Sequence, residues 1–254
     1  MAVIDLNCDM GESFGTYKLG YDAEAMPYVT SINVACGFHA SDPYNMEKTV
    51  RLAKKHGIAI GAHPGFHDLV GFGRRSMAAS VEEIKADIIY QIGALWAFCA
   101  AEGLKLQHVK AHGAMYNQAA VNVNEAVAIA EAIKAVDPNM YMLCLGNSAM
   151  VEGAKKVGVK YVEEAFADRA YTAQGTLVSR KLPGSVFHDV NHVAERVVAM
   201  VKDKAVTAID GAVVPINAQT ICVHGDTPGA VDMIKAIRTK LEQAGVTLQP
   251  FGKA

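Results

Sequence analysis

The chain has 254 residues, of which 51% are hydrophobic and 20% charged, so it can bury a large core and is not intrinsically disordered. A net charge of −2, with Lys and Arg scattered along the chain, argues against a nucleic-acid-binding surface and a polybasic membrane anchor. No apolar run reaches the roughly 18 residues of a membrane-spanning helix, and the first residues lack the pattern of a signal peptide. Five cysteines without CxxC spacing argue against a disulfide framework or a zinc finger. We therefore expect a cytoplasmic protein with no nucleic-acid and no membrane partner.

Short apolar runs that alternate with helical patterns predict the strands of a parallel sheet. The first run, Val3 to Leu6, leads directly into a polar stretch with the sequence DLNCDMGE. In chain order, we expect strands at residues 3–6, 29–35, 58–62, 107–111, 141–145, 159–163 and 220–223, with a short terminal strand at 246–250.

Helices are predicted between these strands by capping residues and by apolar positions that recur every three or four residues. Ser80 and Glu83 form an S-x-x-E capping box at the start of a long helix that ends near Ala101. Further helices are expected at residues 45–56, 122–136, 147–156 and 191–201. A last helix is expected after a cap at Asp226 or Thr227, with Pro228 in its first turn. Residues 13–28 read as a covering loop with a short helix, and residues 172–190 as a loop without periodicity.

The strands alternate with helices about seven times, and polar residues follow the strands. Only a closed or nearly closed barrel brings seven strand ends to one site, because the outer strand ends of an open sheet diverge. We predict an α/β fold with a single domain over residues 1–254, a distorted TIM-like (β/α)7 barrel. An open doubly wound sheet is the alternative.

Ionisable side chains gather at the expected strand ends. Asp5, Asp9 and Glu12 place three carboxylates within eight residues, and removing such charges from water costs several kcal/mol each unless a cation or a metal compensates. Ionisable side chains also follow the later strands, at His39, His63, Lys110, His112, Glu164, Asp168, Arg169, His224 and Asp226. We infer that these residues form one polar site.

Two histidines end consecutive strands. His39 and His63, together with Asp9 or Glu12, would supply the two imidazoles and one carboxylate that commonly bind a catalytic divalent metal with open positions. The alternative is that these side chains hydrogen-bond a polar substrate and act as general acids or bases.

The stretch HVKAHGAMYN places Lys110 and His112 on the same face of a strand. A lysine on an inward face is costly unless it meets an anion. Lys110 is therefore expected either to form an ion pair with Asp5 or Glu164, or to stabilise charge on a carbonyl or phosphoryl oxygen of a ligand.

Other candidate ligand contacts follow the third and fourth strands. Arg74 and Arg75 in the sequence GFGRR have the bidentate geometry that suits carboxylate or phosphate. Asn117 could orient a ligand or cap the following helix. The chain contains no GxxxxGK[ST] loop and no GxGxxG after a strand, so it has no recognised nucleotide-binding loop.

Six stretches, in this order and spacing, closely resemble the LamB/YcsF family: DLNCDMGE, NVACGFHASDP, GAHPGFHDLVGFGRR, HVKAHGAMYN, EAFADRAY and ICVHGDTPGA. The likeness extends from residue 3 to about residue 250. The chain departs from the family at Ser41, where glycine is common, at Ala111, where proline is common, and at Phe66-His67, where Tyr-Pro is common. His67 is therefore assigned no essential role.

The resemblance implies a TIM-barrel-like fold similar to the glycoside hydrolase/deacetylase group. It also implies ATP-dependent hydrolysis of 5-oxo-L-proline (pyroglutamate) to L-glutamate, carried out with 5-oxoprolinase subunits B and C, and we expect that the chain could also form a homo-oligomer. A five-membered lactam is a poorly electrophilic amide, so its opening benefits from coupling to ATP. The alternatives are a metal-dependent deacetylase or carbohydrate hydrolase on the same scaffold, and a non-catalytic subunit that presents substrate to partners.

Candidate roles follow from this hypothesis. The catalytic candidates are Asp9, Glu12, Lys110 and His112. The candidates for binding substrate or phosphate are Asn7, Arg74, Arg75, Asn117, Asp168, Arg169 and His224. A divalent metal of unknown identity would be held by His39 and His63, with Asp9 or Glu12.

Overall fold

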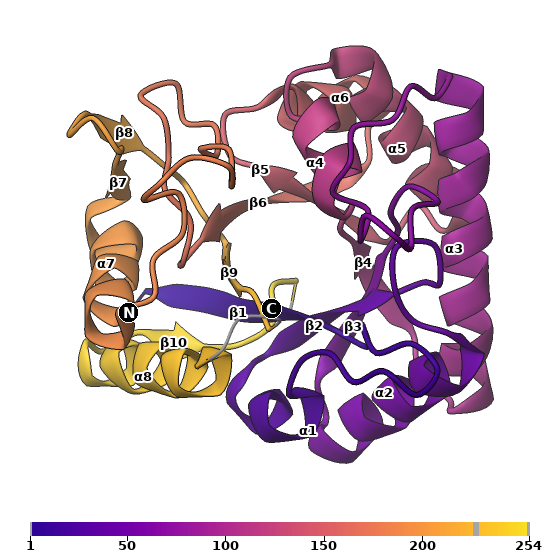
Figure 1. The fold of residues 1–254 in the computed structure, drawn as a ribbon, viewed down its shortest axis with the longest axis horizontal. Helices are drawn as coiled ribbons and strands as arrows, with labels where there is room; N and C mark the ends of the chain where they lie inside the picture. Colours follow the sequence, from indigo (N-terminus) through magenta and orange to yellow (C-terminus); the bar gives the residue numbers. More distant parts are fainter. Residues whose placement is uncertain (1, 226–228, 253–254) are drawn as a thin grey trace.

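A computed structural model describes residues 2–225 and 229–252. Within these residues, seven parallel strands form a barrel that closes where β1 pairs with β9 (Figure 1). The barrel strands are β1 (Val3–Met10), β2 (Ser31–Ala35), β3 (Ala59–His63), β4 (Leu106–Val109), β5 (Tyr141–Leu145), β6 (Lys160–Phe166) and β9 (Thr220–Val223). The predicted closed barrel is confirmed, and the pairing of β1 with β9 excludes the open sheet. That a single domain extends over all of residues 1–254 stays a prediction.

Helices surround the barrel in Figure 1. They are α1 (Asp22–Ala25), the 3-10 helix η1 (Met26–Tyr28), α2 (Pro43–His56), α3 (Val81–Ala101), α4 (Gly113–Ala119), α5 (Val123–Val136), α6 (Ala149–Val157), α7 (Val190–Asp203) and α8 (Ala230–Gln243). The sequence predicted most of these within a few residues but missed α4, which has only seven residues and is too short to show a helical period. The predicted caps Asp226 and Thr227, and Pro228, lie outside the described residues.

Three short strands lie outside the barrel or at its edge. The strands β7 (Ala205–Thr207) and β8 (Val213–Pro215) form an antiparallel hairpin that the sequence did not predict. Strands of three residues are too short to show the alternation that identifies a strand. The terminal strand β10 (Thr247–Leu248) pairs with the first residues of β1 and is shorter than the predicted 246–250.

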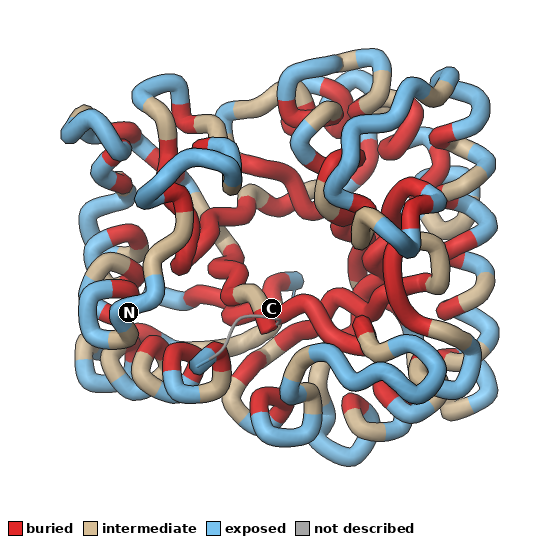
Figure 2. Tube along the Cα trace, viewed as in Figure 1, coloured by how far each residue is buried: buried red, intermediate tan, exposed pale blue. Residues whose placement is uncertain are grey.

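Both faces of the barrel strands are buried (Figure 2). Leu6 and Cys8 on β1 belong to the apolar core under the helices. The alternate residues Asp5, Asn7 and Asp9 point into the barrel, where they accept hydrogen bonds from Ser31 and Asn33 on β2. The barrel interior is therefore polar, although the strands that form it are as buried as those of an apolar core.

The long helix α3 begins at the predicted capping box, in which Ser80 and Glu83 exchange hydrogen bonds. Its inner side packs against β3, β4, α2 and α5. By length and composition alone, α3 is the one helix of the described residues apolar enough to cross a membrane, and a single helix of this kind is weak evidence for a membrane span.

Candidate active site

A cavity of about 510 Å³ opens at the carboxyl ends of the barrel strands. Asp9, His63 and Lys110 line its floor, and Tyr116 and Phe166 are among its apolar walls. Positive side chains contribute to its lining from two separate loops, the one after β3 and the one after β6: Arg74, Arg169, Arg180 and Lys181. The volume suits a small-molecule ligand, and the excess of cations suits an anionic one.

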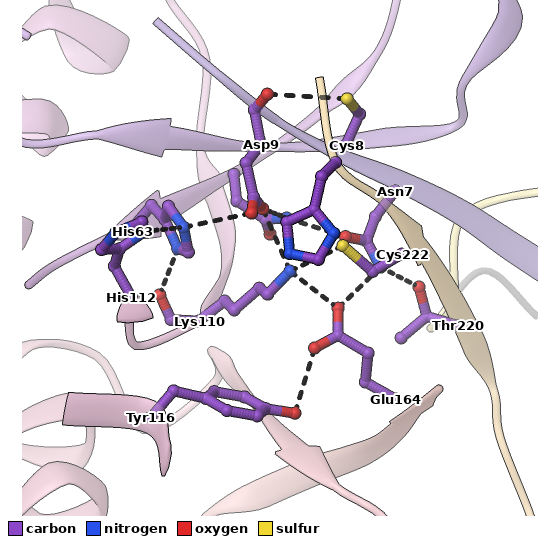
Figure 3. A network of polar contacts seen from close by, with 12 residues as sticks. Asn7, Cys8, Asp9, His63, Lys110, His112, Tyr116, Glu164, Thr220 and Cys222 are labelled. Carbon is purple, nitrogen blue, oxygen red and sulfur yellow. Dashed lines mark hydrogen bonds and ion pairs between the residues drawn. The ribbon is translucent and has the colours of Figure 1, made fainter. Parts of the chain in front are cut away.

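Lys110 is at the centre of the polar network (Figure 3). Its Nζ lies 3.0 Å from Asp9 Oδ1, 3.0 Å from Glu164 Oε1 and 3.0 Å from Cys222 Sγ. The side chain is buried, which by itself lowers the pKa of Lys110, but the charges of Asp9, Cys222 and Glu164 outweigh burial and raise that pKa well above its ordinary value. The lysine therefore stays charged. It uses its three N–H groups on the protein.

Asp9 is ionised for the complementary reason. Burial alone would raise the pKa of Asp9, but the positive charges of His63 and Lys110 hold it well below its usual range. Asn33 Nδ2 donates to Asp9 Oδ1 over 2.8 Å, and His63 Nε2 lies 3.4 Å from Asp9 Oδ2. A buried carboxylate with these partners can accept further hydrogen bonds from a molecule in the cavity.

Below this level, the barrel is filled by a second polar layer. Asn7 Nδ2 donates to Glu164 Oε1 over 3.0 Å and to Thr220 Oγ1 over 2.6 Å. The carboxylate of Asp5 accepts hydroxyl hydrogens from Thr30, Ser31 and Thr220, and burial raises the pKa of Asp5 to about 6 despite these bonds. Lys110 pairs with Glu164 and Asp9, so of the two partners that the sequence suggested, Glu164 is correct and Asp5 is not.

Three histidines and Glu12 lie beside the cavity floor. One ligating atom from each of Glu12, His39, His63 and His112 lies within 4.8 Å of the others. The rings of His39 and His112 stack with centroids 3.6 Å apart. Burial, reinforced by the charge of neighbouring histidines, holds the pKa values of His39 and His112 well below the ordinary value, so both rings are neutral. These buried groups could hold a metal ion.

Gly73 closes the loop over these rings. Its φ of +62° favours glycine, and a Cβ added there would lie 2.7 Å from His39 Cβ and 2.8 Å from His112 Cδ2. The second glycine of GFGRR is thus required by the packing of the imidazoles.

Of the remaining residues predicted to bind a ligand, some line the cavity and others contact only protein groups around it. Arg74, Asn117, Arg169 and His224 line the cavity. Arg169 also donates to the carbonyls of residues 178 and 185, so it holds the loop over residues 170–185 in place.

Asp168, Arg75 and Asn7 are not among the cavity-lining residues. Asp168 accepts from His224 Nδ1 over 2.9 Å, and burial is outweighed by the charge of His224, so the pKa of Asp168 is lowered. Arg75 binds Asp68. Direct ligand contacts by these three residues stay a prediction.

Sequence reasoning missed Cys222, Tyr116 and the cationic loop at Arg180 and Lys181. The signal for Cys222 was present, because Thr220, Cys222 and His224 alternate along one strand in the same way as Lys110 and His112. The loop carries no periodic pattern and could not be placed from sequence.

The closed barrel and the charged cluster at the carboxyl ends of its strands define a (β/α)-barrel protein with a small-molecule site in the position where such barrels carry their active sites. The chain belongs to the LamB/YcsF family, whose sequence model matches residues 4–254.

Relatives named as the A subunit of 5-oxoprolinase match over nearly their whole length. The one from Campylobacter jejuni is 52% identical over 98% of this chain and 97% of its own, and the one from Pyrococcus furiosus is 53% identical over 98% of both. A crystal structure described as a lactam utilization protein from Thermus thermophilus is 49% identical, with a TM-score of 0.93 over 98% of this chain and 100% of its own.

Proposed function

We propose that this chain is a subunit of an ATP-dependent 5-oxoprolinase, which hydrolyses 5-oxo-L-proline to L-glutamate while ATP is hydrolysed to ADP and phosphate. The observation that carries the proposal is the buried Lys110–Asp9–Glu164 cluster on the floor of a cavity lined by several cations. The names of the full-length relatives support the same reaction. We also propose that the protein is cytoplasmic and that its partners are 5-oxoprolinase subunits B and C.

The chemistry accounts for the ATP requirement. Phosphorylation of the lactam oxygen makes the ring carbon electrophilic, and addition of water gives a tetrahedral intermediate. The ring C–N bond then breaks as the nitrogen takes up a proton, which leaves γ-glutamyl phosphate. A second water releases phosphate and glutamate, so one ATP and two waters are consumed per ring opened.

The residues of the cavity suit these steps. Asp9 is kept ionised by Lys110 and lines the cavity, so it can accept a hydrogen bond from the attacking water and orient it. Arg74 and Arg180 line the same cavity and would bind the substrate carboxylate or a phosphoryl group. Lys110 acts by fixing Asp9 and Glu164, because its three N–H groups are already used on the protein.

A metal-dependent deacetylase is the second candidate. It is favoured by one observation, the cluster of Glu12 with His39, His63 and His112. Activity on an N-acetylated sugar with a bound metal, together with no activity on 5-oxoproline, would support this second function.

The test uses the complex reconstituted from this chain and its two partner subunits. Alanine substitutions at Asp9, His63 and Lys110 are each expected to lower kcat by about 100-fold or more, the usual effect of removing a positioned catalytic group. Arg51→Met is the control, because Arg51 is exposed and binds Glu47 and Glu102 on the outer surface. Full activity of all three folded variants would show that the site is assigned wrongly.

A further inference from the structure

Two backbone carbonyls fix the tautomers of two neighbouring histidines. His63 Nδ1 lies 2.7 Å from the carbonyl oxygen of Lys110, and His112 Nε2 lies 2.8 Å from that of Phe72. A carbonyl oxygen only accepts, so each of these nitrogens carries its hydrogen and donates. The other nitrogens, His63 Nε2 and His112 Nδ1, face each other at 3.0 Å (Figure 3). Two lone pairs that face each other are compensated either by a metal ion or by a proton on His63 Nε2, which also lies 3.4 Å from Asp9 Oδ2.

His39 adds a third imidazole, whose ring nitrogens have no hydrogen-bond partner among the described residues. The residue is nevertheless only 1% exposed. Buried polar groups in folded proteins are nearly always satisfied, so an orphaned ring indicates a ligand that the protein chain does not itself supply. Glu12 Oε1 lies 3.7 Å from His39 Nε2, and Glu12 is also buried.

We propose that Glu12, His39, His63 and His112 together bind one divalent transition-metal ion such as Zn²⁺. Three imidazoles and a carboxylate are donors that zinc and cobalt accept. The carbonyl contacts of His63 and His112 are the outer hydrogen bonds that usually orient histidine ligands.

The spacing of the donor atoms is consistent with such a site. Two ligands about 2.0–2.1 Å from a tetrahedral ion lie about 3.3 Å apart. Two of the separations, 3.0 Å between His63 and His112 and 3.7 Å between His39 and Glu12, bracket this value, and all four donors lie within 4.8 Å of one another. The rings of His39 and His112 stack in parallel, with an interplanar angle of 1°, so one of them has to turn for both lone pairs to meet a single ion. The proposal does not depend on the reaction catalysed, because the site would be the same in an oxoprolinase and in a deacetylase.

A second group of donors, Asp9, Cys222 and His224, does not make a comparable site. Lys110 Nζ lies 3.0 Å from both Asp9 and Cys222, and its positive charge already compensates Asp9. Burial raises the pKa of the Cys222 thiol well above its ordinary value, so this sulfur stays protonated. Of the two carboxylates that the sequence offered as a metal ligand, Glu12 is therefore assigned to the metal and Asp9 to Lys110. His112 is added to the ligand set.

The test measures metal binding and not activity. The purified full-length chain is stripped with chelator, loaded with Zn²⁺ or Co²⁺, and analysed for bound metal and Kd. One equivalent is expected. His39→Ala and His112→Ala should weaken Kd by more than the roughly 10–100-fold that loss of an outer-shell partner costs. His108→Gln is the matched control, because His108 is equally buried in the barrel but bonds Asn33 and Gln107. Unchanged Kd in both alanine variants would overturn the proposal.

X-ray absorption on the loaded wild-type protein covers the case in which the variants do not fold. The expected shell contains nitrogen and oxygen only, with scattering from several imidazoles. A sulfur ligand would place the metal at Cys222 and contradict the assignment. No binding to folded wild-type protein, with a proton shared between His63 and His112 in nitrogen-resolved NMR spectra, would also overturn it.

Discussion

At the scale of single residues, one ammonium group makes the polar barrel interior possible. Lys110 contacts the carboxylates of Asp9 and Glu164, both of which are buried. Two like charges this close would repel each other and would be poorly solvated. The ammonium group of Lys110 offsets both the repulsion between the carboxylates and their loss of solvation. The same contacts therefore stabilise the fold and hold Asp9 and Glu164 in the site.

Replacement of Lys110 by Met keeps the volume and removes the charge. Because breaking a buried ion pair leaves an uncompensated charge, Lys110→Met should lower the free energy of unfolding at pH 7 by about 3–5 kcal/mol. Urea denaturation measures this change, with the exposed Lys55→Met as control. Addition of Glu164→Gln should restore part of the loss, since it removes one orphaned carboxylate. A loss below about 1 kcal/mol, the value of a surface pair, would contradict this view of Lys110.

Asp5 should make stability depend on pH. Burial raises the pKa of Asp5 from 3.8 to about 6, so the folded state holds this proton more tightly than the unfolded state does. Stability from this group is therefore present in full below about pH 4 and is lost as the pH rises to about 6. The loss is at most about 3 kcal/mol. Asp5→Asn should flatten the profile over this window, measured by urea denaturation at several pH values. Parallel profiles of the variant and the wild type would show that Asp5 does not titrate in this way.

At the scale of elements, the sequence predicts those helices and strands whose bounds are set by neighbouring residues. The strands β5 and β9 have the predicted bounds, because each is a short apolar run with polar or turn-forming neighbours. The hairpin β7–β8 was missed because its strands are too short to show alternation. Ser41 has a φ of 76°, which lies in the region that favours glycine, so the structure gives a physical reason for the glycine that the resemblance predicts at this position.

The capping box of α3 provides a direct test at this scale. Ser80→Ala removes the hydrogen bonds that Ser80 Oγ shares with Glu83 and should cost about 1 kcal/mol of stability. For a chain of this size that corresponds to a decrease in Tm of about 2–4 °C. Calorimetry measures it, with Ser76→Ala as the control, an exposed serine in the preceding loop. Equal Tm values for the two variants would show that the box contributes little.

At the scale of the whole molecule, barrel closure determines which residues meet. Lys110 and Asp9 are 101 positions apart, and no spacing rule could show that they touch. The expectation that they converge came from the count of strands and from the polar residues at the strand ends. Sequence could not show which carboxylate pairs with Lys110, or that His112 faces His63. Those details depend on the register between strands and on the hydrogen bonds of each ring.

The most direct measurement is glutamate release from 5-oxoproline by this chain, alone and with its two candidate partner subunits, each with and without ATP. Release only when both partners and ATP are present is the predicted result, because activation of the lactam requires phosphoryl transfer within the assembled enzyme. No release under any of these conditions, with the chain folded and metal supplied, would contradict the oxoprolinase function and favour a metal-dependent deacetylase.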